Sequence, residues 1–326
     1  MRILIVHPTV SFQNYNSGDF LTFLGGRSLL YKLFSDVQMI YLDWNRAILD
    51  IDSYLNLLNY GDIDIITIMG LPCFSCCKEN SLIKIISKLR IKFGNAKFIA
   101  LGIGQSYGFP LLQLSDYMQI SYVEQFRDFF AITTRDFLAH KILEDNNIPN
   151  MYFYDMSIFA YELLNDWNDG YILERNPLSI FLPPPSIVQD EYMVNEIIKT
   201  ELDFIRENKP LIITLDISNK DRFKALYGID VIVVDDINYL VNIYKRSSKL
   251  LTTRIHQAIL GMLMGATSFC IAVDMRYLTL CPFDIEIINT GNKPLWIPQT
   301  DLLPFSLSEL INGVYTKQVK DYFDNS

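Results

Sequence analysis

A Thr-Thr-Arg-Ile-His segment at residues 252–256 has the composition of a site that binds an anion and moves a proton. It lies where an apolar run gives way to a helical pattern, so Arg254 and His256 fall on the first turn of the expected helix. A helix start presents unpaired N–H groups and positive partial charge. A guanidinium and an imidazole added there suit a phosphate or carboxylate. A capping arginine and a histidine held by a backbone carbonyl explain the pattern equally well.

The helix that follows this segment has one apolar face. Hydrophobic residues at positions 255, 258, 259, 262 and 263 have the spacing of a single buried side. Arg254 lies off that face and His256 lies at its border, so both are expected to point forward from the helix tip into a cleft. Thr252 or Thr253 can cap the same helix.

Three further segments have residue types that fit a binding site. Arg135 and Asp136 follow an apolar run and open a helical pattern, although Asp136 is also an ordinary capping residue. An Asn-Ser-Gly-Asp loop occupies residues 16–19, and a Gly-Ile-Gly loop occupies residues 102–104. Neither loop is a dinucleotide fingerprint or a P-loop, so bound nucleotide is not predicted. The chain also has no nucleophile elbow and no metal-ligand pairs at suitable spacing, so no metal is predicted.

Apolar runs alternate with amphipathic stretches along the whole chain, which predicts an α/β protein built on parallel sheets. Expected strands cover residues 3–6, 39–42, 63–69, 98–102, 129–133, 151–154, 179–182, 211–215, 231–234, 249–252 and 268–273. Expected helices cover residues 19–34, 81–93, 111–118, 136–146, 191–207, 219–227, 237–246, 254–264 and 306–324. A polar stretch at 165–177 marks a boundary between two Rossmann-like domains, 1–170 and 171–326, which face a cleft; the terminal helix closes the chain.

The composition limits the class of protein. The chain has 326 residues, of which half are hydrophobic, and its net charge is −9, which argues against a nucleic-acid partner. There is no signal-peptide pattern, and the longest apolar stretch, 258–264, is too short to span a bilayer, so a cytoplasmic location is expected. Cys73, Cys76 and Cys77 form the one cysteine cluster in the sequence, and we interpret them as reduced thiols because no second pair completes a zinc site.

Taken in order, these segments resemble the polysaccharide pyruvyl transferase family. The matching elements are the Asn-x-Gly-Asp loop at 16–19, the Gly-x-Gly loop at 102–104, the Arg135-Asp136 pair, the 252–256 segment, and a strand that ends in Asp274. The resemblance covers nearly the whole chain. It departs from the family at residues 69–73, where Met-Gly-Leu-Pro-Cys replaces a run of glycines, and this leaves the acceptor site less defined.

The resemblance implies a two-domain fold of the GT-B type and transfer of a pyruvyl group from phosphoenolpyruvate to a glycan, forming a ketal. It implies that Arg254 and Arg135 bind the phosphate or carboxylate of the donor. His256 is then the general acid, and Asp19 lies near the acceptor or positions a loop. The remaining substrate-binding positions that it implies are Asn16, Gly18, Gly104, Thr253 and Asp274.

The same resemblance implies no cofactor and no metal. The expected partners are phosphoenolpyruvate and a sugar or lipid-linked glycan acceptor of the cell surface, which is compatible with a place at the inner face of the membrane. Two alternatives stay open. One is a glycosyltransferase of the same fold that uses a nucleotide sugar. The other is an inactive family member that acts as a glycan-binding or assembly subunit, although such a subunit has no need for Arg135, Arg254 and His256.

Overall fold

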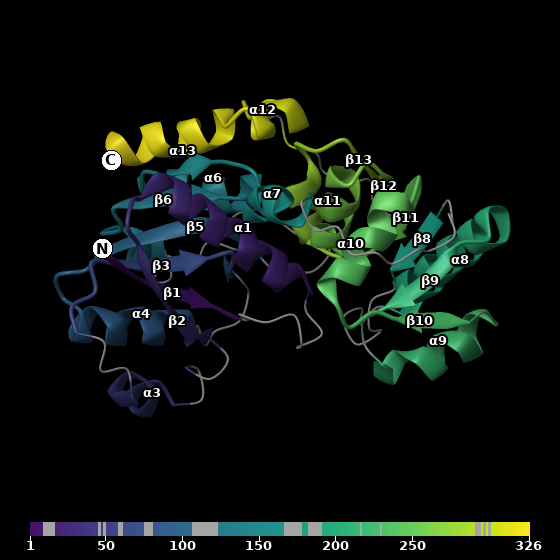
Figure 1. Cartoon of the computed structure of the whole chain (residues 1–326), viewed down its shortest axis with the longest axis horizontal. Helices are drawn as coiled ribbons and strands as arrows, with labels where there is room; N and C mark the ends of the chain where they lie inside the picture. The colour runs from purple at the N-terminus through teal and green to yellow at the C-terminus, as the bar shows by residue number, and fades with distance from the viewer. Residues whose placement is uncertain are drawn as a thin grey trace. The chain divides into compact units, whose positions relative to one another are not determined.

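The chain forms two compact units in a computed structural model (Figure 1). The structure describes residues 1–8, 17–44, 47, 50–57, 61–74, 81–105, 123–165, 178–181, 191–215, 217–228, 230–290, 295, 298 and 301–326. Unit 1 comprises Met1–Val10, Thr22–Ala160 and Ser306–Ser326, and unit 2 comprises Ser11–Leu21 and Tyr161–Phe305.

This division differs from the expected domains at both ends of the chain. The C-terminal segment belongs to unit 1, and residues 11–21 belong to unit 2. The terminal helix joins unit 1 because its aromatic side chains pack there. Phe323 lies edge-on to Phe34 and Phe130, with ring centroids 6.3 and 6.5 Å apart. The Tyr322 hydroxyl accepts a hydrogen bond of 3.3 Å from the backbone N–H of Ile132.

Unit 1 is built on a parallel sheet in the order β2-β1-β3-β5-β6-β7, with β4 pairing to β5. Its strands are β1 (Arg2–His7), β2 (Gln38–Asp43), β3 (Ile65–Met69), β4 (Pro72–Phe74), β5 (Lys97–Gln105), β6 (Ala131–Thr134) and β7 (Met151–Tyr152). Its helices are α1 (Ser17–Leu33), whose first residues belong to unit 2, α3 (Ile51–Leu57), α4 (Ser81–Lys92), η2 (Glu124–Phe126), α6 (Phe137–Asp145), η3 (Met156–Ala160), α12 (Leu307–Ile311) and α13 (Val314–Asp324). Every residue of β3 is buried, as expected for a parallel strand covered on both faces.

Unit 2 is a second parallel sheet, in the order β10-β9-β8-β11-β12-β13. Its strands are β8 (Leu178–Phe181), β9 (Leu211–Thr214), β10 (Val231–Val233), β11 (Lys249–Thr252), β12 (Thr267–Ala272) and β13 (Ile285–Asn289). Its helices are α7 (Tyr161–Asn165), α8 (Glu191–Asn208), η5 (Ile217–Asn219), α9 (Lys220–Tyr227), α10 (Ile237–Arg246), α11 (Ile255–Leu263) and η6 (Met275–Leu280). The strand order is that of a dinucleotide-binding fold, in which ligands bind beyond the carboxyl ends of the strands near the point where the order reverses.

The predicted α/β class with two Rossmann-like sheets is confirmed. Each expected strand overlaps an observed one. The elements that were not predicted are β4, β13, α3, α7 and the short helices η2, η3 and η6. The expected helix at 306–324 is two helices, because Gly313 has φ 74° and ends α12 before α13 begins. The expected helix at 111–118 lies outside the described residues.

Among the helices that the structure describes, none is long and apolar enough to cross a membrane.

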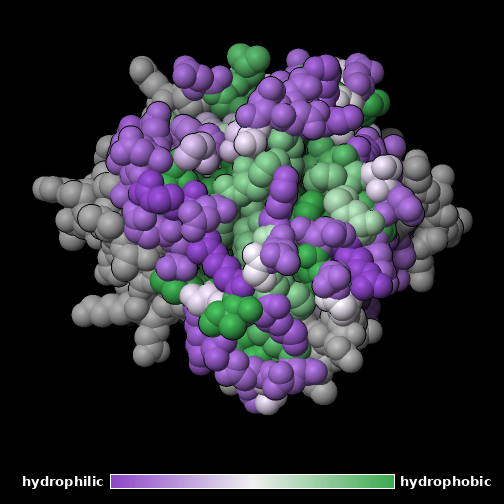
Figure 2. Space-filling view, turned by 90° about the vertical axis from the view of Figure 1, so that its left-hand side faces the viewer, coloured by the Kyte–Doolittle hydropathy of each residue, from purple (hydrophilic) through white to green (hydrophobic). Residues whose placement is uncertain are grey.

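A broad hollow of about 1100 Å³ lies at the amino ends of the strands of unit 1. Its walls include Asp64, Lys97 and Phe130. Figure 2 looks at the left-hand side of Figure 1, where hydrophobic side chains gather at the centre and hydrophilic ones surround them. The hollow is therefore at the opposite edge of the sheet from the carboxyl ends, where α/β proteins bind their ligands.

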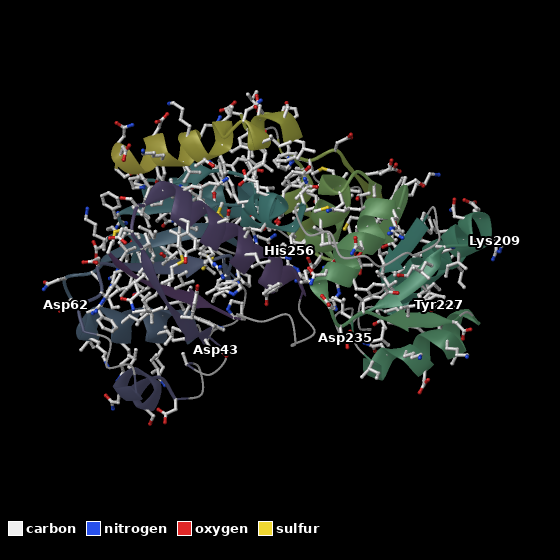
Figure 3. All side chains as sticks on the ribbon, viewed as in Figure 1. Asp43, Asp62, Lys209, Tyr227, Asp235 and His256 are labelled. Carbon is white, nitrogen blue, oxygen red and sulfur yellow. The ribbon has the colours of Figure 1, made fainter. Side chains whose placement is uncertain are left out.

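A buried carboxyl group lies in the core of unit 2. Glu201 on α8 is 3% exposed and packs among apolar residues of the same unit. The Tyr227 hydroxyl on α9 (Figure 3) donates a hydrogen bond of 2.6 Å to Glu201 Oε2. Burial raises the pKa of Glu201 from 4.5 to about 7, and the hydrogen bond from Tyr227 opposes part of that rise.

This pair should make the stability of the protein depend on pH. Because the folded-state pKa is raised, the contribution of Glu201 to stability is full below pH 4.5 and is lost as pH rises to about 7. We therefore expect Glu201→Gln to raise the free energy of unfolding at pH 8 by about 2–3 kcal/mol and to change it little at pH 4.5. Urea unfolding at both pH values measures this, with exposed Glu207→Gln on the same helix as control. Equal effects of Glu201→Gln at the two pH values would contradict it.

Candidate functional site

A small cavity of about 130 Å³ lies at the carboxyl ends of two neighbouring strands of unit 2. β11 and β12 pair in parallel, and the chain leaves them at Thr252 and Ala272. The segments that follow each strand line the cavity together: residues 253–257 after β11, and Val273, Asp274 and Arg276 after β12. The cavity therefore occupies the edge of the sheet at which this fold binds ligands.

Arg254 and His256 both line this cavity at the start of α11. Figure 3 labels His256. Contrary to the prediction, neither Thr252 nor Thr253 is the N-cap residue; Arg254 takes that position, and its backbone N–H donates a hydrogen bond of 3.0 Å to Thr252 Oγ1. The helix begins one residue later than predicted, so His256 lies within its first turn. The Arg254 guanidinium, the His256 imidazole and the positive end of the helix thus belong to one surface.

Thr253 adds a hydroxyl group to the same cavity wall. Its side chain is 5% exposed, and within the described part of the chain its Oγ1 has no hydrogen-bond partner. A buried hydroxyl without a partner is costly, because it has lost its water without gaining a replacement bond. A bound anion in the cavity is able to supply that partner.

Gly18 brings the start of α1 against His256. A Cβ atom at position 18 would lie 2.4 Å from His256 Nδ1 and 3.1 Å from Cγ, so only glycine allows this approach. Both residues belong to unit 2 and line the cavity. Two motifs separated by more than 200 residues in the sequence therefore meet at the imidazole. Asn16, from the same loop, lies outside the described residues.

Asp274 holds a second arginine at this cavity. Its carboxylate accepts hydrogen bonds from Arg276 Nε at 2.9 and 2.8 Å and from Arg276 Nη2 at 2.5 Å. Burial alone lowers the pKa of Arg276, but the hydrogen bonds and charge of Asp274 outweigh burial and raise it. The charge of Asp19 acts on Arg276 as well, which places Asp19 near the cavity. Asp274, expected to bind substrate, thus orients Arg276 in the structure.

Arg276 is a charged residue of the cavity that the sequence analysis did not select. The available signal was weak: an arginine two positions after the aspartate that ends an apolar strand. Cys270 also lines the cavity. Burial raises the pKa of its thiol to about 12, so the sulfur stays protonated near neutral pH and is a poor nucleophile.

Arg135 and Gly104, the other expected binding residues, lie in unit 1. Arg135 is 3% exposed; its Nη1 donates to the Gly70 carbonyl at 3.0 Å and lies 3.3 Å from the buried carboxylate of Asp155. A Cβ at Gly104 would lie 2.6 Å from Arg135 Nε, so the glycine loop packs on the arginine. These are the contacts of a residue that holds the unit together, and a substrate contact of Arg135 remains a prediction.

Asp136 has a structural role in the same region. Its carboxylate accepts hydrogen bonds from the backbone N–H groups of Ala139 at 2.8 Å and Gln105 at 2.9 Å, which caps α6 and ties it to the end of β5. Burial raises the pKa of Asp136, and these hydrogen bonds counteract the rise. Cys73 is a buried free thiol beside Arg135, as predicted, while Cys76 and Cys77 lie outside the described residues.

Comparison with known proteins gives one family and several related folds. Residues 16–275 match the model of a family described as polysaccharide pyruvyl transferase. No curated protein sequence matches this chain significantly. Among solved structures, UDP-GlcNAc 2-epimerase from Neisseria meningitidis bound to UDP-GlcNAc is similar with a TM-score of 0.58 at 8% identity, covering 99% of this chain and 93% of that one.

Two further epimerases have the same fold. A putative UDP-N-acetylglucosamine 2-epimerase from Listeria monocytogenes has a TM-score of 0.57 at 11% identity, over 99% of this chain and 89% of that one. The enzyme from Methanocaldococcus jannaschii has a TM-score of 0.54 at 10% identity, over the full length of both chains. At these identities the likeness establishes a fold of the GT-B type and nothing about substrate.

Proposed function

We propose, because the chain belongs to the polysaccharide pyruvyl transferase family, that it moves a pyruvyl group from phosphoenolpyruvate to two hydroxyls of a glycan and forms a ketal. The observation that carries this proposal is the cavity at the carboxyl ends of β11 and β12, where Arg254, His256 and Arg276 lie together. Phosphoenolpyruvate has a phosphate and a carboxylate, and two arginines offer a planar donor group to each.

The reaction needs a proton donor and charge stabilisation at this cavity. The methylene carbon of phosphoenolpyruvate gains a proton, and its central carbon forms bonds to two acceptor oxygens as phosphate leaves. The two hydroxyl protons balance the proton given to the methylene and the proton that leaves with phosphate. His256 is the general acid, either at the methylene or at the departing phosphate. Arg254 and Arg276 stabilise the negative charge on the donor, and the Thr253 hydroxyl donates to one of its oxygens.

The size of the cavity favours this donor over a nucleotide sugar. Its volume is about 130 Å³, whereas sites for drug-sized ligands and cofactors occupy about 300–1,000 Å³. A three-carbon phosphate suits the smaller volume. The glycosyltransferase alternative is supported by the fold alone. Among the similar structures, UDP-GlcNAc is bound by the epimerase from Neisseria meningitidis, which shares the fold at 8% identity. An inactive binding subunit is less consistent with an arginine pair beside a histidine.

Phosphate release is the direct test of this proposal. The purified protein is incubated with phosphoenolpyruvate and a panel of oligosaccharides, and released phosphate and acceptor mass are measured. We expect phosphate release that depends on the acceptor, and a mass gain that corresponds to a pyruvyl ketal. Calorimetry should show binding of phosphoenolpyruvate and none of UDP-GlcNAc. Release of nucleoside diphosphate from a sugar donor, with no reaction of phosphoenolpyruvate, would establish the glycosyltransferase alternative instead.

A further inference from the structure

A buried polar pair lies behind the first turn of α11. Tyr244 on α10 and Gln257 on α11 are both 0% exposed. The Tyr244 hydroxyl donates a hydrogen bond of 2.6 Å to Gln257 Oε1. Gln257 also lines the cavity described above, and the charge of Arg254 acts on the Tyr244 hydroxyl. The pair therefore connects the packed interior between α10 and α11 with the residues of the candidate site.

Tyr244 has one hydrogen-bonding role in this setting. Burial raises the pKa of its hydroxyl, so the group stays protonated and acts as the donor to Gln257. Gln257 Oε1 is then the acceptor, which fixes the orientation of the side-chain amide. The hydrogen bond also determines the distance and direction between one point on α10 and one point on α11.

Much of the remaining burial of α11 is apolar and adds contact area rather than direction. The buried face of α11 includes Ala258, Ile259, Leu260 and Leu263, which pack through apolar contacts. Such contacts are non-directional and tolerate small rotations of a helix about its axis. Arg254 and His256 lie within one turn of Gln257 at the start of α11, so a rotation of this turn about the helix axis would change the direction of both side chains. A directional bond at Gln257, the next residue after His256, prevents that rotation.

We propose that Tyr244 and Gln257 are positioning residues, which fix the rotation of the first turn of α11 and so direct Arg254 and His256 into the cavity. The part of this proposal that concerns donor binding rests on the proposed function. The part that concerns the first turn does not, because it is measurable in the protein without a substrate. Two backbone amides report on it: Gln257 N and Ala258 N donate to the Arg254 carbonyl at 3.0 and 3.1 Å.

The test compares Tyr244→Phe with the double variant Tyr244→Phe/Gln257→Met. The single variant leaves a buried amide oxygen without its donor and should lower the melting temperature. The double variant replaces both polar groups by apolar ones of similar shape and should recover most of the stability. If the pair only stabilises the core, the double variant recovers wild-type amide exchange and a wild-type KM together with its stability. If the pair positions the turn, both variants stay altered at the site.

We expect hydrogen exchange at the Gln257 and Ala258 amides to be about tenfold faster in both variants, and the KM for phosphoenolpyruvate to rise by about tenfold or more in both. Tyr227→Phe, which removes a buried hydrogen bond of the same length elsewhere in unit 2, is the matched control and should leave both readouts unchanged. A double variant with wild-type exchange and wild-type KM overturns the inference. Altered exchange in a protein that shows no turnover of phosphoenolpyruvate supports the positioning role and rejects the proposed function.

Discussion

Replacement of His256 by alanine is expected to lower turnover with phosphoenolpyruvate by about 100-fold or more, with little change in stability. His256 lines the cavity with Arg254 and Arg276, and Gly18 packs directly against its ring. Under the proposed function, its removal leaves the two cations to bind the donor but takes away the general acid of the reaction. The loss should therefore appear in kcat, and the KM for phosphoenolpyruvate should change much less.

A second histidine provides the matched control for this experiment. His140 lies in unit 1, stacked on Tyr152, and its Nδ1 lies 2.7 Å from Asn150 Oδ1. His140→Ala removes the same chemical group from a residue that does not line the cavity, so turnover should stay within about twofold of wild type. If His256→Ala keeps wild-type turnover, His256 has no part in proton transfer, and Gly18 and Arg254 surround a structural imidazole.

Local sequence was enough to locate the helix start that carries the candidate site. The apolar run at 249–252 and the 3.6-residue pattern after it predicted both β11 and α11. The positions of Arg254 and His256 follow from that junction alone, because both lie within one helical turn. Arg276 could not be selected in this way. It reaches the cavity because β12 pairs beside β11, and such pairing depends on residues far apart in the chain.

The segment around Arg135 shows why the same local pattern can have a different outcome. Arg135 also follows an apolar strand and threonines at the start of a helix, as Arg254 does. Its guanidinium lies against Asp155, a buried carboxylate 20 residues later. Nothing in the local pattern indicates that partner, since Asp155 reaches it through β7 and the turn that follows. Burial and a distant charge therefore decide between a binding residue and a structural one.

Arg135→Met should consequently destabilise the protein by about 3–5 kcal/mol in urea unfolding. The substitution keeps much of the apolar volume but leaves the Asp155 carboxylate, which is fully buried, without its counter-charge. The Gly70 carbonyl loses its donor at the same time. Removing the negative charge as well, in Arg135→Met/Asp155→Asn, should recover part of the loss, because an unpaired buried charge is the largest cost.

An exposed arginine in the same unit provides the control for this substitution. Arg127 pairs with Glu124 at 2.7 Å and is 46% exposed, so solvent screens the pair and Arg127→Met should unfold at nearly the same urea concentration as wild type. The predicted substrate contact of Arg135 gives a different outcome. If Arg135 binds the donor and the ion pair is dispensable, Arg135→Met unfolds like wild type and raises the KM for phosphoenolpyruvate. A large loss of stability that the added Asp155→Asn change partly reverses shows instead that Arg135 acts on the site only by keeping unit 1 folded.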